Sequence, residues 1–221
     1  MKKTSKILLI IILIIVGLGG GVLVYFYIQS NDTVTHSGYV RVYVNSTIYS
    51  SLSSELAQYE QDLETQGYNA DIISWSDPFV ENLKGDIVIS QNSTFVGAVL
   101  IGKLPYALYQ NNTVFPCDLY LMDLDGLWGD LINSDGIYDT HTGGTGDIFP
   151  EIWIGRIDPE ILNNLAVSHL QAYKDYFNRN HAYRTGILSR PNSALLYVDD
   201  EWSTWNSSWY DALTKSYSNT T

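Results

Sequence analysis

The chain has 221 residues, of which 45% are hydrophobic and 13% aromatic, so it can bury a core and does not belong to the disordered class. Its formal net charge is −12, with 24 acidic residues against 12 lysines and arginines, and an acidic surface repels phosphate backbones, so nucleic acid is not expected as a partner. Cys117 is the only cysteine, so packing or a bound metal must stabilise the fold without an intrachain disulfide.

The N-terminal segment predicts a membrane anchor. No charged residue occurs between Lys6 and Asp32, and residues 7–28 are dominated by Ile, Leu, Val, Gly and aromatic residues. A helix of this length crosses a bilayer core, and the lysines before it keep the N-terminus cytoplasmic. A cleaved signal peptide is the alternative, but its apolar region is shorter and ends at small residues. We predict a cytoplasmic tail over residues 1–6, a transmembrane helix over 7–28 in the cell membrane, a linker over 29–37 and an extracytoplasmic α/β domain over 38–221.

The rest of the chain alternates between two hydrophobic periods. Residues 39–44 alternate in the manner of a strand, and the continuous apolar run 97–102 is typical of a buried parallel strand. Such alternation predicts a parallel α/β sheet with right-handed crossovers, in which function lies at the carboxyl ends of the strands. Those ends carry residues 102–105 and 199–202. Strands are predicted over 39–44, 69–75, 97–102, 151–155 and 193–198, and helices over 51–66, from 77, over 159–178 and from 209.

The most informative stretch runs from Phe115 to Arg156 and is rich in glycine and aspartate. Carboxylate oxygens on flexible loops are the ligands that Ca²⁺ prefers, and close carboxylates without a cation repel one another. The spacing is not that of an EF-hand, because glycine follows Asp125 at once and no glutamate closes the loop. The alternative is that Asp and Gly form turns and caps. The candidate Ca²⁺ ligands are Asp123, Asp125, Asp130, Asp135, Asp139 and Asp147.

Several phrases in this stretch resemble the gingipain family of cysteine peptidases. They are residues 115–120 (FPCDLY), 123–126 (DLDG), 135–139 (DGIYD) and 150–157 (PEIWIGRI). The resemblance spans roughly Tyr39 to Trp202 and implies a caspase-like three-layer α/β sandwich with a mostly parallel central sheet, incomplete in this chain. It also implies bound calcium, without assigning ligands, and a peptide or protein substrate for the intact parent.

The catalytic pair of such a peptidase has no counterpart in the sequence. The family needs a histidine, usually before glycine, and a cysteine, each after a strand; no His-Gly pair occurs, and both groups are expected beyond residue 221. Cys117 lies among acids, which disfavour a thiolate, so we expect a small buried residue there. His141 could join a metal site or remain a loop histidine. Arg156 is expected to pair with a loop carboxylate, and Lys103 departs from the acid or small polar residue expected after the glycine.

Three functions stay open on the sequence. The first is a membrane-anchored, gingipain-like cysteine peptidase domain that is inactive in these 221 residues. The second is a non-catalytic, calcium-stabilised surface binding module. The third, an α/β enzyme of another kind, has the least support, because the sequence has no phosphate-binding glycine loop, no G-x-S-x-G and no HExxH.

Overall fold

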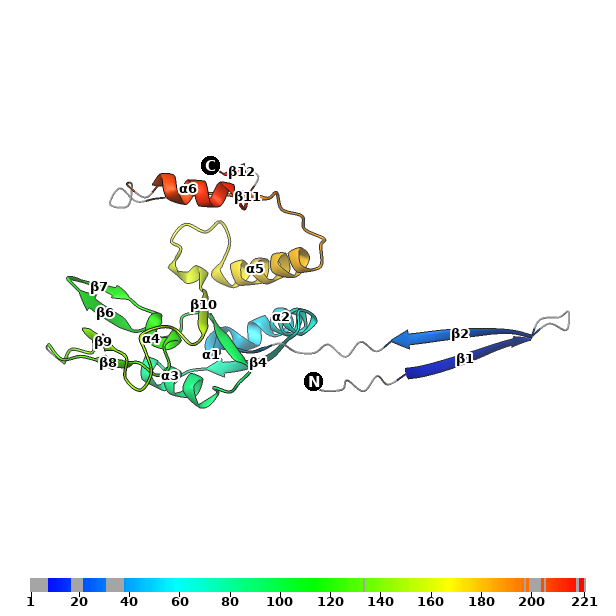
Figure 1. The fold of residues 1–221 in the computed structure, drawn as a ribbon, viewed down its shortest axis with the longest axis horizontal. Coiled ribbons are helices and arrows are strands. Elements are labelled where there is room, and N and C mark those ends of the chain that lie inside the picture. Colours follow the sequence, from blue (N-terminus) through cyan, green and yellow to red (C-terminus); the bar gives the residue numbers. More distant parts are fainter. Residues whose placement is uncertain are drawn as a thin grey trace.

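The central sheet consists of β3 (Gly38–Asn45), β4 (Tyr68–Trp75), β5 (Phe95–Ile101) and β10 (Trp153–Ile157). These strands are all parallel, in the order β10-β5-β3-β4, in this computed structural model (Figure 1). The apolar runs of β3 and β5 fit the middle of a sheet that is covered on both faces. The structure describes residues 8–16, 22–30, 38–132, 134–196, 198, 204, 206–217 and 219–220.

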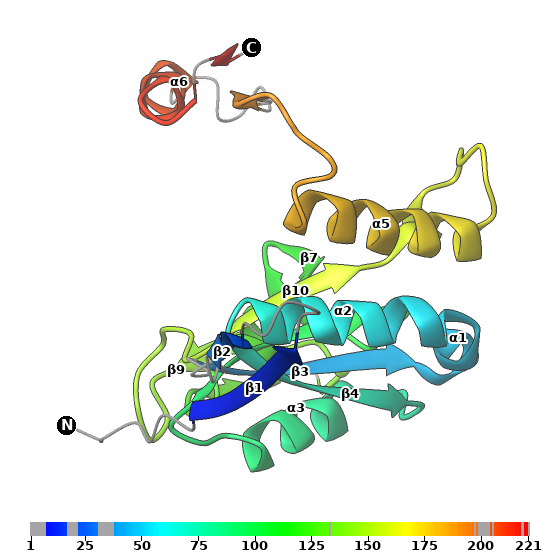
Figure 2. The same ribbon diagram turned by 90° about the vertical axis from the view of Figure 1, so that its right-hand side faces the viewer.

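Helices cover both faces of this sheet, which gives three layers (Figure 2). On one face α2 (Ser53–Thr65), which follows α1 (Ser46–Tyr49) and η1 (Ser50–Leu52), packs with α5 (His169–Arg184). On the other face lie α3 (Val80–Ile89) and α4 (Leu119–Met122). Successive strand side chains point to opposite faces, so Val42 and Val44 join the first core and Tyr43 the second. The predicted α/β class with a mostly parallel sheet is confirmed.

The direction of the crossovers reverses beside β3. The connection from β3 to β4 runs through α2 on one face, and the connection from β4 to β5 runs through α3 on the other. β3 therefore pairs with β4 on one side and with β5 on the other. In open α/β sheets such a reversal leaves a crevice at the carboxyl ends of the strands.

Short hairpins and helices complete the description. β6 pairs with β7, and β8 pairs with β9, both antiparallel. These pairs lie in the segment between β5 and β10 that contains the acidic loop. The remaining bounds are β6 (Leu108–Asn111), β7 (Thr113–Pro116), β8 (Leu127–Gly129), β9 (Thr140–Thr142), η2 (Pro159–Ile161), β11 (Ser193–Ala194), α6 (Asn206–Thr214) and β12 (Asn219–Thr220).

The sequence predicts a transmembrane helix over residues 7–28. The parts that the structure describes here, residues 8–16 and 22–30, are strands and not a helix. β1 (Leu8–Val16) and β2 (Val22–Ser30) form an antiparallel hairpin, with Leu8 opposite Ser30. Ile and Val dominate β1, and β-branched residues favour strands, while the glycines in the sequence between the two strands disfavour a continuous helix. Among the described residues, no helix combines the length and the apolar character that a bilayer crossing requires.

Two predictions near the C-terminus are also corrected. The helix predicted over 159–178 is a single 3-10 turn, η2, followed by a loop, and α5 begins only at His169, where Ser168 Oγ accepts from Gln171 N at 3.2 Å. The strand predicted over 193–198 is the two-residue β11, which pairs with β12 and not with the central sheet. Of the segment 199–202, predicted to lie at a strand end, nothing falls within the described residues.

Candidate metal centre

Three acidic side chains meet at the amino-terminal end of β10. Asp123 and Asp125 come from the loop after α4, and Glu151 lies just before β10. Each offers a carboxylate oxygen within 4.8 Å of the other two. The backbone N–H groups of Glu151 and Ile152 both donate to Met122 O, at 3.1 and 3.3 Å, which holds the end of α4 beside the start of β10. This group, called the acidic centre below, could hold a metal ion.

Burial differs among the three carboxylates. Asp123 is fully buried, Asp125 is half-buried and Glu151 is exposed. On the inner side, Asp123 Oδ1 accepts a hydrogen bond from Gly126 N at 2.7 Å, and Asp123 Oδ2 accepts one from Nε2 of His141. Protein donors therefore hold the inner carboxylate in place, and the Glu151 side of the centre is open to solvent.

Two glycines make room for the carboxylates. A Cβ atom at Gly126 would overlap the carboxylate of Asp123, and a Cβ atom at Gly146 would overlap that of Asp125. The loop also closes on itself here, because Thr145 N donates to Asp125 O at 3.1 Å. Glycine suits both positions because the backbone approaches a carboxylate so closely that a Cβ atom would displace it.

Lys84 of α3 brings one positive charge to the acidic centre. Its Nζ lies 4.4 Å from the ring centroid of Tyr120 and 6.0 Å from that of Trp128. Burial lowers the pKa of Lys84, and the neighbouring carboxylates, Asp123 first, act in the opposite direction without cancelling that effect. The Lys84 ammonium does not balance the three carboxylates, and a divalent cation would offset the negative charge that remains.

The hairpin of β8 and β9 positions His141. Its register places His141 opposite Trp128, and the two rings stack with centroids 3.9 Å apart and planes 16° apart. The ring is thereby held with Nε2 on the carboxylate of Asp123. His141 supports a carboxylate of the centre, as the partners of metal ligands do in many metal sites.

The other four predicted ligands lie outside the acidic centre. Each of them accepts a hydrogen bond from a nearby backbone amide, which is the turn-forming role that Asp commonly takes in loops. As metal ligands they stay predictions. The bonds run from Gly136 N to Asp130 Oδ2 (2.8 Å), from Ile137 N to Asp135 Oδ1 (3.0 Å), from Ile132 N to Asp139 Oδ2 (2.7 Å) and from Phe149 N to Asp147 Oδ1 (2.7 Å).

Sequence reasoning missed Glu151 and Lys84 as parts of this centre. Glu151 follows Pro150 directly before the apolar run that forms β10, and an acid at the start of such a strand is a usable signal because the strand fixes its position. Lys84 gave no signal, since it lies on a different helix and meets the loop only through the packing of α3 against the sheet.

Arg156 of β10 pairs with Asp118, an acid of the same stretch, as expected. Its Nε and Nη2 donate to the two carboxylate oxygens of Asp118 at 2.6 and 2.8 Å. The neighbouring Cys117 is half-buried, not fully buried as expected, and its backbone N donates to Ala107 O at 2.9 Å. Arg156 thus ties the segments 115–120 and 150–157 to each other.

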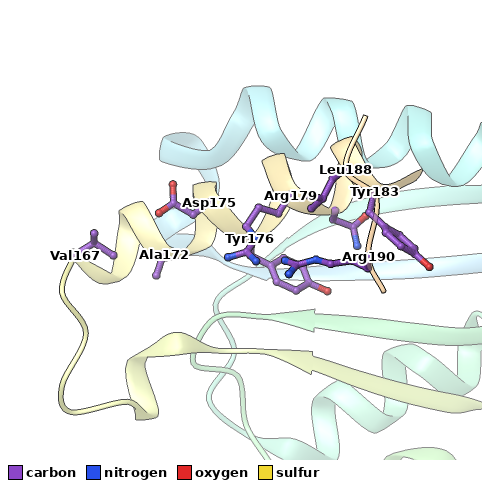
Figure 3. Close-up of a pocket in the computed structure, with 9 residues that line it drawn as sticks. Val167, Ala172, Asp175, Tyr176, Arg179, Tyr183, Leu188 and Arg190 are labelled. Carbon is purple, nitrogen blue, oxygen red and sulfur yellow. The ribbon is translucent and has the colours of Figure 1, made fainter. Parts of the chain in front are cut away.

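A separate groove of about 510 Å³ follows the outer side of α5 (Figure 3). The inner side of this helix is occupied by the buried Tyr173 and Phe177. Arg179 and Arg190 line the groove and form no ion pair within the described part of the chain. The other lining residues are Val167, Ala172, Asp175, Tyr176, Asn180, Tyr183 and Leu188.

No protein-family model, no curated protein and no solved structure matches this chain. Its function is therefore inferred from the geometry of the acidic centre and from the residues of the sequence.

Proposed function

We propose that the chain is a surface binding module whose acidic loop is ordered by a hard divalent cation, with Ca²⁺ as the first choice. The observation that carries the proposal is the approach of Asp123, Asp125 and Glu151 to within 4.8 Å of one another. Carboxylate oxygens select Ca²⁺, Mg²⁺ or Mn²⁺ over softer metals. Three carboxylates on a loop favour Ca²⁺, because its coordination geometry is flexible, whereas Mg²⁺ demands a near-ideal octahedron and usually keeps several waters.

Thermal unfolding in Ca²⁺ and in a chelator tests this proposal. A cation that binds the folded state at about 100 times its Kd adds about 2.7 kcal/mol of stability. For a domain of this size the midpoint should rise by about 5–10 °C. Equal midpoints in Ca²⁺, Mg²⁺, Mn²⁺ and chelator, together with no heat on calorimetric titration, would remove the proposal.

A matched pair of glutamate variants locates the effect. Glu151→Gln removes one charge from the acidic centre and should abolish most of the rise. Glu160→Gln removes the same charge from the exposed turn η2, outside the centre, and should leave the rise intact. If both variants respond like the wild type, the cation binds elsewhere.

The location of the domain is part of the same proposal. The uncharged apolar segment 7–28, with Lys2, Lys3 and Lys6 before it, supports attachment to the cell membrane. The full chain should stay with membranes after alkaline carbonate washing, and a chain of residues 38–221 should be released. Release of both would contradict membrane attachment.

Kinship with the gingipain-type cysteine peptidases is a second candidate. It is supported by the motif residues and by the contact of Arg156 with Asp118, which joins two of the motif segments. Proteolysis would then belong to a longer parent, because Cys117 follows none of the strands of the central sheet directly. A fluorogenic peptide assay on this chain should show no turnover. Turnover that a thiol alkylator abolishes would show that these residues suffice for catalysis.

A further inference from the structure

A pocket of about 320 Å³ opens at the carboxyl ends of β3, β4 and β5. It lies at the opposite end of the strands from the acidic centre, which sits at the start of β10. It occupies the place where the crossovers reverse beside β3, and ligands of open α/β sheets bind at such places. The pocket is lined by Asn45, Ser46 and Thr47, by Trp75, Ser76, Asp77 and Pro78, and by Lys103, Leu104, Pro105 and Tyr106.

Residues 103–106 form one wall of the pocket, and side-chain donors from β3 and β10 hold this wall in place. Asn45 Nδ2 donates to Lys103 O at 2.6 Å. Arg156, itself held by Asp118, donates from Nη1 to Leu104 O at 3.1 Å and from Nη2 to Pro105 O at 2.8 Å. Three successive carbonyl groups are therefore fixed, and the wall is organised before any ligand arrives.

Three of the donors that line the pocket have no partner among the described residues, whereas Asn45 and Thr47 are engaged with the protein. Within the described residues, neither Lys103 Nζ nor the hydroxyls of Ser46 and Ser76 form a hydrogen bond or an ion pair. The one carboxylate, Asp77, is engaged: its Oδ1 accepts from Phe79 N at 2.9 Å and its Oδ2 from Asn82 Nδ2 at 2.8 Å. An unpaired lysine is notable in a chain with twice as many acids as bases, and here it points to an anionic ligand.

Aromatic rings supply the apolar part of the lining. Trp75 is fixed by its Nε1–H, which donates to Asp77 O at 2.9 Å, and by an edge contact with Tyr43 at 5.5 Å. Tyr106 is 52% exposed, and the Arg156 guanidinium lies 5.9 Å from its ring centroid. Rings held in this way bind flat apolar groups with little loss of conformational freedom.

We propose that this pocket binds a small aromatic carboxylate, with the carboxylate on Lys103 and the flat body against Trp75 and Tyr106. This function is separate from cation binding at the acidic centre and does not depend on it. A pocket of about 320 Å³ admits a molecule of one or two rings.

The probe pair is indole-3-acetate and its neutral amide, indole-3-acetamide, titrated into the full chain by calorimetry and by saturation-transfer NMR. The carboxylate should bind with a Kd of about 0.1–1 mM, and the amide at least tenfold more weakly. Lys103→Gln should weaken binding of the carboxylate about tenfold or more, because the charge-assisted bond is lost. Tyr106→Ala should weaken it as well, and Tyr106→Phe should restore it.

The groove along α5 provides the matched control, since it also carries unpaired cations. Arg190→Gln removes one charge there and should leave the affinity unchanged. Loss of binding in Arg190→Gln with retention in Lys103→Gln would overturn the proposal and assign the anion to the α5 groove. Equal binding of the acid and the amide would also overturn the proposal. So would the absence of detectable binding at about 10 mM indole-3-acetate, far above the expected Kd. Cation-induced stabilisation should persist in Lys103→Gln, so the two proposals can fail separately.

Discussion

The two ends of the central strands are built in different ways. At the amino-terminal end, the acidic centre is made mainly by one stretch of chain, in which Gly126 and Gly146 let the loop close on its own carboxylates. At the carboxyl end, residues 103–106 are held by Asn45 of β3 and Arg156 of β10, which are far away in the sequence. One end gathers negative charge that a cation would balance, and the other presents donors that lack a partner.

This difference predicts how each end responds to change. A charge-rich loop should depend on an added ion, whereas a wall fixed by protein donors should depend on the side chains that fix it. The hydrophobic core between the two ends should be insensitive to the added ion and to the side chains that fix the wall. It should lose stability when its own buried groups ionise. Alkaline pH, cation binding and single substitutions therefore affect different parts of the molecule.

The largest effect is expected from alkaline pH. Burial is the main cause that raises the pKa of Tyr43 and of Tyr173 above the ordinary value of 10.0, and both residues are fully buried. Between pH 10 and the raised pKa the folded state holds more protons than the unfolded state, so stability falls as pH rises, by about 1.4 kcal/mol per pH unit for each tyrosine. Denaturant titrations from pH 9 to 12, with tyrosinate absorbance, measure this; stability that holds constant over the range would contradict it.

Loss of the inner carboxylate should be the most damaging single substitution. Asp123→Ala leaves Gly126 N and the ring of His141 without their acceptor in a buried place. We expect a loss of about 2–4 kcal/mol in the free energy of unfolding and no remaining response to Ca²⁺. Asp147→Ala, in which an exposed turn loses the acceptor of Phe149 N, should cost about 1 kcal/mol or less and keep that response.

The carboxyl end should be most sensitive at Arg156. Arg156→Lys cannot keep both bonds to Asp118 together with those to two carbonyl groups, because an ammonium lacks the planar fork of guanidinium. We expect a loss of about 1–3 kcal/mol in urea unfolding, with the rise in Ca²⁺ preserved. Arg179→Lys, at the α5 groove, should be nearly neutral. An Arg156→Lys protein that loses its cation response would show that the two ends are coupled.

A pair of glycine variants should give the smallest effects, with opposite signs. Gly146→Ala places a Cβ on the carboxylate of Asp125, so it should lower stability by about 1 kcal/mol and weaken the response to Ca²⁺. Gly85→Ala, where a Cβ would meet nothing within 4 Å in the helix α3, should raise stability by about 1 kcal/mol. A fully retained cation response in Gly146→Ala would argue against Asp125 as a ligand.

The central sheet could be predicted because its signals are local. The alternation in residues 39–44 and the apolar run 97–102 became β3 and β5, and helix spacing in residues 51–66 became α2. The helix predicted over 159–178 is right from His169 and wrong before it, where the apolar residues lie in a loop and Leu162 is 52% exposed. The sequence alone could not distinguish the hairpin of β1 and β2 from a single helix, since an apolar run without periodicity fits both structures.

The acidic centre could be predicted only in part. The stretch was recognised by its composition, but composition treats seven aspartates alike, and only tertiary packing separates Asp123 and Asp125 from the others. Glu151 and Lys84 reach the centre through β10 and α3, and no spacing in the sequence records that approach. The pocket at the carboxyl end follows the same rule: its location was expected from the sheet, whereas the bonds of Asn45 and Arg156 that shape it were not.

Diffraction from crystals soaked in Tb³⁺ or Mn²⁺ tests the central claim most directly, since the anomalous signal locates the ion. We expect one strong peak about 2.0–2.6 Å from carboxylate oxygens of Asp123, Asp125 and Glu151. A peak among Asp130, Asp135 and Asp139 with none at the acidic centre, or no peak at all at saturating ion, would contradict it.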